Sequence, residues 1–357
     1  MQTLELLYET IYKNNSFFDR KQSITQKKTI LYGPRKSGKT HLIIDHLSHY
    51  EKGSFLYIDF SDDRLEKGSL EENLSLFIKK HPIKLLVIEH FDFSFALPKI
   101  NEIILSTIFT CKALEGFSKL TLYPLDFEEF IAFDKKHSNI EHIFNLFANH
   151  GTFPQIVQYT ESDHHRAMQD MLHGMLKDET AFHIYKRFCE LQSTKVTLFQ
   201  IYNQLKSTMK ISKDKLYSIT STLIEQKLLF LVEKQGQSSA ARKVFQVDFA
   251  LKNAMTFKKD FLKRFENMIF LELLKRDKTI FYDDFIDLYL PDEQLAVFCI
   301  PFATDEVIQS KMKKLTHMLK SLHVTKVEII TLGNEESFVL DTIHFSMLPF
   351  WDWALQL

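Results

Sequence analysis

Short apolar runs alternate with longer amphipathic segments in the first part of the chain. The segments at 41–50, 70–80 and 127–133 have the length and apolar spacing of helices. Strands that alternate with helices favour a parallel sheet with crossover helices on its faces. We therefore predict an α/β domain here. Its strand-like runs are 29–32 (TILY), 54–60 (SFLYIDF), 84–89 (KLLVIE), 103–106 (IILS) and 119–122 (KLTL).

The pattern becomes helical at 144–191, where apolar residues recur every three or four positions. Two short helical segments follow, at 198–206 and 213–226. Two β-like runs come next, at 228–233 and 244–249, joined by the polar stretch KQGQSSAARK. The order helix, helix, hairpin is typical of a winged helix-turn-helix.

The last 90 residues return to a mixed pattern. Helical spacing is found at 265–275 and 308–322, and strand-like runs lie at 279–282, 294–300 and 326–332. These runs predict a further α/β region.

The composition is that of a soluble globular protein of two or three domains. The chain has 357 residues, 45% hydrophobic and 25% charged, which excludes a disordered or fibrous protein. No apolar run approaches the ~18 residues of a membrane span, and the first ten residues carry acids where a signal peptide carries bases. Three widely spaced cysteines, Cys111, Cys189 and Cys299, predict neither a disulfide framework nor a zinc cluster. We therefore expect a cytoplasmic protein that makes no membrane contact.

The run GPRKSGKT matches the pattern G-x-x-x-x-G-K-[ST], which cradles the phosphates of a nucleotide. It follows the strand-like run TILY and precedes a helical segment, the context that this motif requires. Glycines let backbone N–H groups face the phosphate oxygens, and the following helix N-terminus adds positive potential. The lysine reaches the β- and γ-phosphates, and the final hydroxyl is a ligand of Mg²⁺. The predicted nucleotide-binding residues, for ATP with Mg²⁺, are Gly33, Pro34, Arg35, Lys36, Ser37, Gly38, Lys39 and Thr40.

A carboxylate at the end of a neighbouring strand is the next requirement of a phosphate-hydrolysing site, because it holds the Mg²⁺ ion. The best candidate is Glu89, which ends the run KLLVIE and would share the metal with Thr40. His90 or Asp92 would then position the attacking water, so these three residues are the predicted catalytic set. A surface carboxylate is the alternative interpretation of Glu89, and Asp59 is a weaker rival for the metal.

Two hydroxyl side chains, Ser106 and Thr107, end the fourth strand-like run. Either would hydrogen-bond a γ-phosphate if this strand lies beside the phosphate loop. Strand-end hydroxyls without a role are an equally good interpretation. Ser106 is included among the predicted nucleotide-binding residues.

Several motifs together resemble those of prokaryotic AAA+ ATPases of the STAND-like archaeal type. They are GPRKSGKT, KLLVIEHFD, IILS, YPLDFEEF, HGTFP, FENMIFLELLKR and the terminal LPFWDW. In that family a P-loop domain precedes a winged helix and a domain related to PD-(D/E)XK nucleases. The resemblance implies four regions: a P-loop domain at 1–143, a helical linker or lid at 144–192, a winged helix at 193–260 and a nuclease-like domain at 261–357.

Two positions depart from the family pattern in ways that concern hydrolysis. The family has Asp-Glu at the end of the metal-binding strand, where this chain has Glu89 and His90. The family's Gly-Arg is Gly-Phe here, at 116–117. Such an arginine is worth about 10³–10⁵ in rate. The resemblance therefore implies ATP binding with slow or absent hydrolysis, with Lys112 and Lys119 as the nearest candidates to replace the arginine in part.

The C-terminal region keeps only part of a nuclease's residues. Such an enzyme holds metal with carboxylates and needs a lysine on the next strand to activate water. Glu266 and Asp287 match two acidic positions, but the strand VFCIPF at 297–302 has neither a carboxylate nor a lysine. Glu266 is alternatively an acid near a helix N-terminus. We predict an inactive nuclease-like domain.

The predicted winged helix coincides with the most basic part of the chain. Between Lys195 and Arg264 there are 14 Lys or Arg against 5 Asp or Glu, a local charge of +9 in a chain of net charge −1. Nucleic acid and an acidic neighbouring domain are both candidate partners. The helix at 213–226 lacks the Arg or Asn that reads bases, whereas Arg242 and Lys243 would contact phosphates if DNA binds.

These patterns favour an ATP-binding protein that acts as a nucleotide-dependent switch, with weak ATP hydrolysis or none. The alternative is a DNA-binding regulator that uses the winged helix, with nucleotide binding secondary. A pure interaction scaffold is the third hypothesis. DNA or another protein is a candidate partner beside ATP, and oligomerisation is left open.

Overall fold

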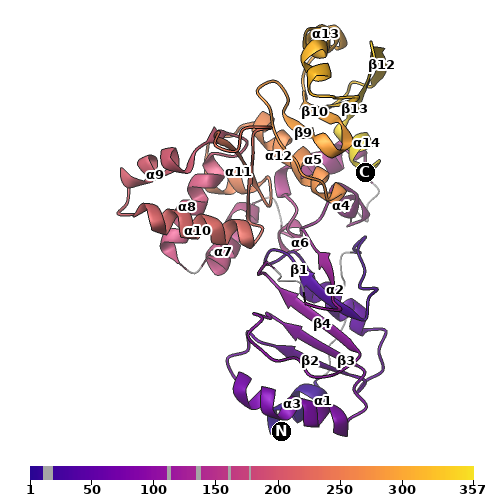
Figure 1. The fold of residues 1–357 in the computed structure, drawn as a ribbon, viewed down its shortest axis with the longest axis vertical. Helices are drawn as coiled ribbons and strands as arrows, with labels where there is room; N and C mark the ends of the chain where they lie inside the picture. The colour runs from indigo at the N-terminus through magenta and orange to yellow at the C-terminus, as the bar shows by residue number, and fades with distance from the viewer. Residues whose placement is uncertain (11–18, 111–113, 134–137, 160–161, 177) are drawn as a thin grey trace. The chain divides into compact units, whose positions relative to one another are not determined.

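The computed structural model describes residues 1–10, 19–110, 114–133, 138–159, 162–176 and 178–357. They form two compact units (Figure 1). The first contains Met1–Leu125 together with Glu225–Lys227, and the second contains Asp126–Ile224 and Leu228–Leu357.

The first unit is built on a five-stranded sheet in which every pairing is parallel. The strand order is β2-β3-β4-β1-β5, so β4 lies between β1 and β3. This confirms the predicted α/β fold class. The strands are β1 (Lys28–Tyr32), β2 (Phe55–Asp59), β3 (Leu85–Glu89), β4 (Glu102–Thr107) and β5 (Ser118–Thr121).

Apolar side chains on both faces explain why helices cover this sheet on both sides. In β3, which is buried along its whole length, Leu86 and Ile88 belong to one core cluster and Leu85 and Val87 to another. Alternate residues of a strand point to opposite faces, so a continuous apolar run needs cover on both. The first cluster includes residues of α1 (Gln2–Glu9) and α3 (Lys67–Lys80), and the second includes residues of α2 (Lys39–Leu47).

The second unit begins at Asp126, earlier than the predicted boundary at 143. The helix α4 (Phe127–Phe133) starts there, and the backbone N–H of its first residue donates to Oε1 of Glu272, 2.9 Å away. Lys275 forms ion pairs with both Asp126 (3.2 Å) and Glu272. These contacts join residues about 145 positions apart in the sequence, and they attach the start of α4 to the segment that contains Glu272 and Lys275.

Aromatic side chains fill the main core of the second unit. The ring of Phe350, near the C-terminus, lies against those of Phe127, Phe144 and Phe265. The terminal segment LPFWDW is therefore part of this core. The helices that contribute to it include α5 (Ile140–His150), α6 (Pro154–Val157), α7 (His164–Met175) and α8 (Glu179–Glu190).

The basic region contains two helices and then an antiparallel pair of strands, in the predicted order. The three-stranded sheet has the order β6-β8-β7. Its elements are β6 (Lys195–Val196), α9 (Leu198–Lys206), α10 (Lys213–Glu225), β7 (Leu229–Val232), β8 (Arg242–Gln246) and the following α11 (Leu251–Met255).

The strand β8 ends at Gln246, whereas the sequence predicted a strand up to 249. The chain turns because the buried carboxylate of Asp248 accepts hydrogen bonds from the backbone N–H groups of Thr152 (2.5 Å) and Phe153 (3.1 Å). A Cβ on Gly151 would overlap this carboxylate. The motif HGTFP thus holds the buried acid that ends β8.

The C-terminal part forms a mixed five-stranded sheet of order β12-β13-β11-β10-β9, drawn in orange and yellow in Figure 1. Ile308, Met312 and Leu319 of α13 belong to the core cluster on this sheet. The elements are α12 (Phe261–Leu273), β9 (Leu288–Leu290), β10 (Leu295–Cys299), α13 (Asp305–Ser321), β11 (Lys326–Thr331), β12 (Glu336–Leu340), β13 (Ile343–Pro349) and α14 (Phe350–Ala354).

One expectation for this part was wrong, and one hairpin was not predicted. The run at 279–282 makes isolated bridges, including Phe281 with Tyr289, and is not a strand. The hairpin β12–β13 was not predicted, because its alternating polar residues give no continuous apolar run. Phe338 stacks on Phe345 across the pair, while Val339 is 55% exposed, as expected for a half-exposed edge.

Candidate functional site

The glycine loop lies where its sequence context predicts, between β1 and α2. Gly33 follows β1, and a Cβ there would overlap the carbonyl oxygen of Leu122. Gly38 has φ 98° and ψ 13° and is the N-cap of α2. Only glycine adopts the backbone conformation of Gly38 readily. The structure therefore requires glycine at both positions, at Gly33 for lack of space and at Gly38 for its backbone angles.

The N-terminus of α2 has no side-chain cap, because its N-cap is Gly38. The first N–H groups of a helix lack intrahelical partners and carry partial positive charge, so they attract an anion. Ser37, fully buried beside them, has a hydroxyl that finds no hydrogen-bond partner among the described residues. The loop therefore retains donors that phosphate oxygens would satisfy.

Lys39 is buried within its own loop and is only 9% exposed. Its Nζ donates to the carbonyl oxygens of Gly33 (2.9 Å) and Pro34 (2.6 Å). Burial lowers the pKa of Lys39 to about 8, although the nearby carboxylate of Glu89 opposes this shift. A buried ammonium that has lost its hydration gains from an anionic phosphate.

The structure brings Thr40 and Glu89 together. Glu89 ends β3 and is 2% exposed. Its Oε1 accepts a hydrogen bond from the Thr40 hydroxyl at 3.0 Å, and its Oε2 accepts one from the hydroxyl of Tyr57. A hydroxyl and a carboxylate are oxygen ligands suited to Mg²⁺. The surface interpretation of Glu89 is therefore wrong, while Tyr57, from β2, is a partner that the sequence analysis missed.

His90 is paired with Asp59, which the sequence analysis considered only as a metal ligand. Asp59 lies opposite Glu89 in the register of β2 and β3. Nδ1 of His90 lies 2.7 Å from Oδ1 of Asp59. Burial would raise the pKa of Asp59, but hydrogen bonds from His90 and Ser61 lower it below its usual value. The carboxylate thus orients the imidazole at the same sheet edge as Glu89.

Asp92 points to a different partner. Its carboxylate forms an ion pair with Lys67 of α3 (2.5 Å) and accepts a hydrogen bond from the hydroxyl of Ser94 (2.6 Å). These contacts fix the turn after β3, so they do not support the interpretation of Asp92 as a catalytic residue.

Ser106 and Thr107 end β4, and both are buried. Ser106 is the register partner of Leu31, next to the phosphate loop. The hydroxyl of Thr107 already donates to the carbonyl oxygen of Phe91 at 2.7 Å. Ser106 is therefore the better candidate of the two for a phosphate contact.

Arg20 forms hydrogen bonds with the backbone of the phosphate loop and of a distant segment. Its guanidinium donates to the carbonyl oxygens of Ser37 and Tyr123, each at 2.7 Å. The contacts span 17 and 103 residues of sequence, so no local pattern pointed to this arginine. It ties the loop to the segment that begins YPLDFEEF.

The positions that the family resemblance gives to a catalytic arginine carry no such residue here. Phe117 packs against the core cluster that contains Leu86 and Ile88. Nζ of Lys119 lies 4.5 Å from the ring centre of Tyr32, and Lys112 lies outside the described residues.

The two acids predicted for the nuclease-like region, Glu266 and Asp287, both contact a lysine of β8. Lys243 of β8, 5% exposed, forms an ion pair with Glu266 of α12, and its Nζ donates to the carbonyl oxygen of Asp287 at 3.2 Å. Burial raises the pKa of Glu266 to about 7, against the attraction of Lys243. An ammonium group therefore occupies the space beside these acids. The described residues contain no cluster of three or more His, Cys, Asp or Glu that would hold a metal ion.

The expected DNA contacts of Arg242 and Lys243 need correction. Lys243 is buried as described, and Arg242 forms an ion pair with Glu233 at 2.7 Å. Both cations are already neutralised by carboxylates, so they are poor candidates for phosphate contacts.

The strand order and the glycine loop define the fold of the first unit as that of a P-loop NTPase domain. No protein-family model matches the sequence. An uncharacterized protein of Methanocaldococcus jannaschii is 22% identical over 392 residues, covering 93% of this chain and 89% of that protein.

Two solved structures are also similar to this chain. The Walker-type ATPase of Pyrococcus abyssi superposes with a TM-score of 0.46 at 13% identity, covering 70% of this chain and 99% of that one. The ORC1 protein of Aeropyrum pernix, in complex with DNA, has a TM-score of 0.32 at 13% identity and covers 65% of this chain and 87% of its own. None of the helices in the described part of the chain combines the length and apolar character needed to cross a membrane.

Proposed function

We propose that this chain is an AAA+-type protein that binds ATP with Mg²⁺ in the first unit and acts as a nucleotide-dependent switch. The observation that carries the proposal is the Thr40–Glu89 hydrogen bond beside the buried ammonium of Lys39. Lys39 and Thr40 begin α2, and Glu89 ends β3, 49 positions after Thr40, yet the three residues form one polar site.

Each residue would have a distinct role in holding the nucleotide. Lys39 would leave the carbonyl oxygens of Gly33 and Pro34 and bind the β- and γ-phosphates. Thr40 and Glu89 would hold the Mg²⁺ ion, which neutralises phosphate charge when bound. Ser106 would reach the γ-phosphate from β4.

Hydrolysis is expected to be slow. With a proton on Nδ1 shared with Asp59, His90 would keep Nε2 as an acceptor for a proton of the attacking water. This arrangement supplies a base but no arginine, since Phe117 occupies that position. Phosphate release at saturating ATP should stay below about 1 s⁻¹, the lower end of ordinary turnover. A faster rate would contradict the proposed switch.

Calorimetric titration with Mg²⁺-ATP tests the binding site itself. The Lys39→Ala variant should lose about 100-fold or more in affinity, because it removes a buried charge contact with the phosphates. Lys36 would contact the phosphates through its backbone N–H, so Lys36→Ala, which removes only an exposed side chain, should bind within a few-fold of the unchanged chain. Equal affinity of the Lys39→Ala variant, with an unchanged circular dichroism spectrum, would refute the site.

The switch requires that ATP alters the second unit. Hydrogen–deuterium exchange with and without Mg²⁺-ATP should show changed protection in segments beyond residue 126. A change restricted to the first unit would leave a nucleotide-binding protein without a switch.

A second candidate function is DNA binding by the helices of the basic region. Nζ of Lys213 lies 4.9 Å from the ring centre of Phe199, which is 52% exposed. Tyr217 of α10 is 47% exposed. Exposed rings beside lysines suit nucleic acid. A gel-shift series should then show binding that weakens steeply with salt, and that falls in a Lys213→Glu variant.

A further inference from the structure

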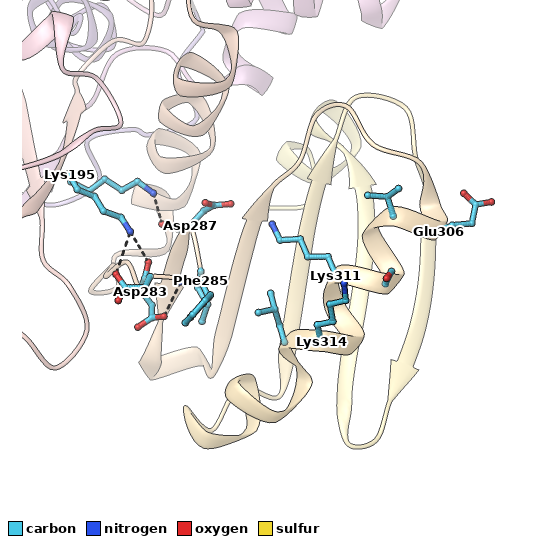
Figure 2. A pocket seen from close by; sticks show the side chains of 13 residues that line it. Lys195, Asp283, Phe285, Asp287, Glu306, Lys311 and Lys314 are labelled. Carbon is cyan, nitrogen blue, oxygen red and sulfur yellow. Dashed lines mark hydrogen bonds and ion pairs between the residues drawn. The ribbon is translucent and has the colours of Figure 1, made fainter.

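A cavity of about 710 Å³ lies within the second unit, far in sequence from the phosphate loop (Figure 2). Its walls come from the loop at 283–287, from one face of α13, and from Lys195 and Lys243 of the three-stranded sheet. A volume of this size is within the range of small-molecule sites.

The wall formed by α13 carries more lysines than acids. The residues that line it are Glu306, Val307, Ser310, Lys311, Lys314 and Leu315, so two lysines and one acid come from this helix. Within the part of the chain that the structure describes, neither lysine forms an ion pair with a carboxylate. Nζ of Lys311 instead lies 5.3 Å from a phenylalanine ring centre. In Figure 2, Lys311 extends towards the 283–287 loop, whereas Glu306 points away.

The acids on the opposite wall are already engaged. Asp284 forms ion pairs with Lys234 at 2.7 Å and Lys195 at 3.7 Å. The carboxylates of Asp283 and Asp287 each accept a backbone N–H, at 3.1 and 2.9 Å. Among the described residues none of these acids forms an ion pair with Lys311 or Lys314, so the two ammonium groups of the α13 wall remain available to an anion.

An exposed aromatic ring lies on the other side of the cavity. Phe285 is 61% exposed although its neighbour Ile286 is 1% exposed and packs in the core. A large apolar ring displayed in a cavity wall offers a stacking surface for a planar group. The cavity therefore combines a planar apolar contact with two ammonium groups.

We propose that this cavity is a second nucleotide site, which binds a nucleoside 5′-monophosphate. The phosphate lies between Lys311 and Lys314, and the base stacks on Phe285. Lysine ammonium groups act as point charges for a phosphate, and base stacking on an aromatic ring tolerates any base. The site is separate from the phosphate loop, so it does not depend on the function proposed for the first unit.

The test is a calorimetric titration of the full chain carrying Lys39→Ala with AMP, GMP, CMP and UMP in turn. A monophosphate lacks the β-phosphate that the loop lysine binds, and the substitution further removes that site. Adding Lys311→Glu and Lys314→Glu should weaken binding about tenfold or more, because two attractive charges become repulsive. Adding Phe285→Ala should weaken it about tenfold through lost stacking.

Lys313→Glu is the matched control, since Lys313 is exposed on α13 but does not line the cavity. It should change the affinity by less than about twofold, as a surface charge does. The proposal is overturned if none of the four nucleotides binds at millimolar concentration, or if the Lys311→Glu/Lys314→Glu variant binds as well as the control. Inorganic phosphate that binds as tightly as the nucleotides would also overturn it, because the ring contact would then contribute nothing.

Discussion

Nδ1 of His90 lies 2.7 Å from Oδ1 of Asp59, across the C-terminal ends of the neighbouring strands β3 and β2. His90 follows Glu89 in the sequence, and Asp59 lies opposite Glu89 in the register of the two strands. The carboxylate of Glu89 accepts a hydrogen bond from the hydroxyl of Thr40. An imidazole oriented by a carboxylate is a recurring arrangement for accepting a proton from water. Of the two residues predicted to position the attacking water, the contacts of His90 fit that role better than those of Asp92.

The first prediction concerns this pair. His90→Gln should lower the slow release of phosphate from ATP about tenfold or more, since a general base contributes at least that much. The affinity for ATP should not change, because His90 takes no part in the phosphate contacts. Asp92→Asn is the control and should leave the rate within about twofold. Equal rates for His90→Gln and the unchanged chain would show that His90 is not the base.

The second prediction follows from the buried ammonium of Lys39, whose pKa is about 8 without nucleotide. A bound phosphate favours the charged form, so it raises this pKa. Binding of ATP should therefore take up protons near pH 8, and the affinity should fall as pH rises through 8. Titrations at pH 8 in buffers of different ionisation enthalpy measure the uptake. No uptake would mean that Lys39 does not contact the phosphates.

The third prediction uses Gly33. A Cβ at this position would overlap the backbone oxygen of Leu122, which cannot rotate away. Gly33→Ala should therefore cost about 2–3 kcal/mol of unfolding free energy and weaken ATP binding. Gly68→Ala meets nothing within 4 Å and lies in α3, so it should be neutral or slightly stabilising. Urea unfolding of both variants makes the comparison, and equal stabilities would contradict the predicted overlap.

The fourth prediction concerns the buried pair of Lys243 and Glu266. Lys243→Met should destabilise the second unit by about 3–5 kcal/mol, because it leaves a buried carboxylate unpaired. Replacing both residues, as Lys243→Met with Glu266→Leu, should recover most of this loss.

The loss should also depend on pH. The pKa of Glu266 is raised to about 7, so the folded chain favours the protonated acid and its burial costs less as pH falls below 7. Lys243→Met should therefore be less harmful at pH 5 than at pH 8. A loss that is the same at both values would mean that Glu266 does not carry the effect.

Part of the fold and of the site could be predicted because the signals are local. The run GPRKSGKT holds its glycines, lysine and hydroxyl within eight contiguous residues. Gly38 has a positive φ as the N-cap of α2, and Lys39 is the first residue of that helix, so both features belong to the local backbone. The apolar runs of β1 to β4 were equally visible, since strands buried on both faces are continuously apolar.

Other features depend on strand order and packing. Tyr57 meets Glu89 only because β2 and β3 are neighbours, and Arg20 reaches Tyr123 over 103 residues. Lys243 and Glu266 belong to elements that carry no shared motif. The half-exposed hairpin β12–β13 has no apolar run to reveal it.

By itself, the sequence determined that a phosphate-binding loop starts the first helix of a parallel α/β sheet, because glycine conformation and apolar periodicity act over a few residues. The tertiary structure determined which acids lie beside that loop and which acids form ion pairs elsewhere. It also determined which lysines of the cavity beside α13 have no carboxylate partner among the described residues. Charged groups interact through space and not along the chain. The partner of each charged side chain is therefore fixed only when segments that are distant in sequence pack together.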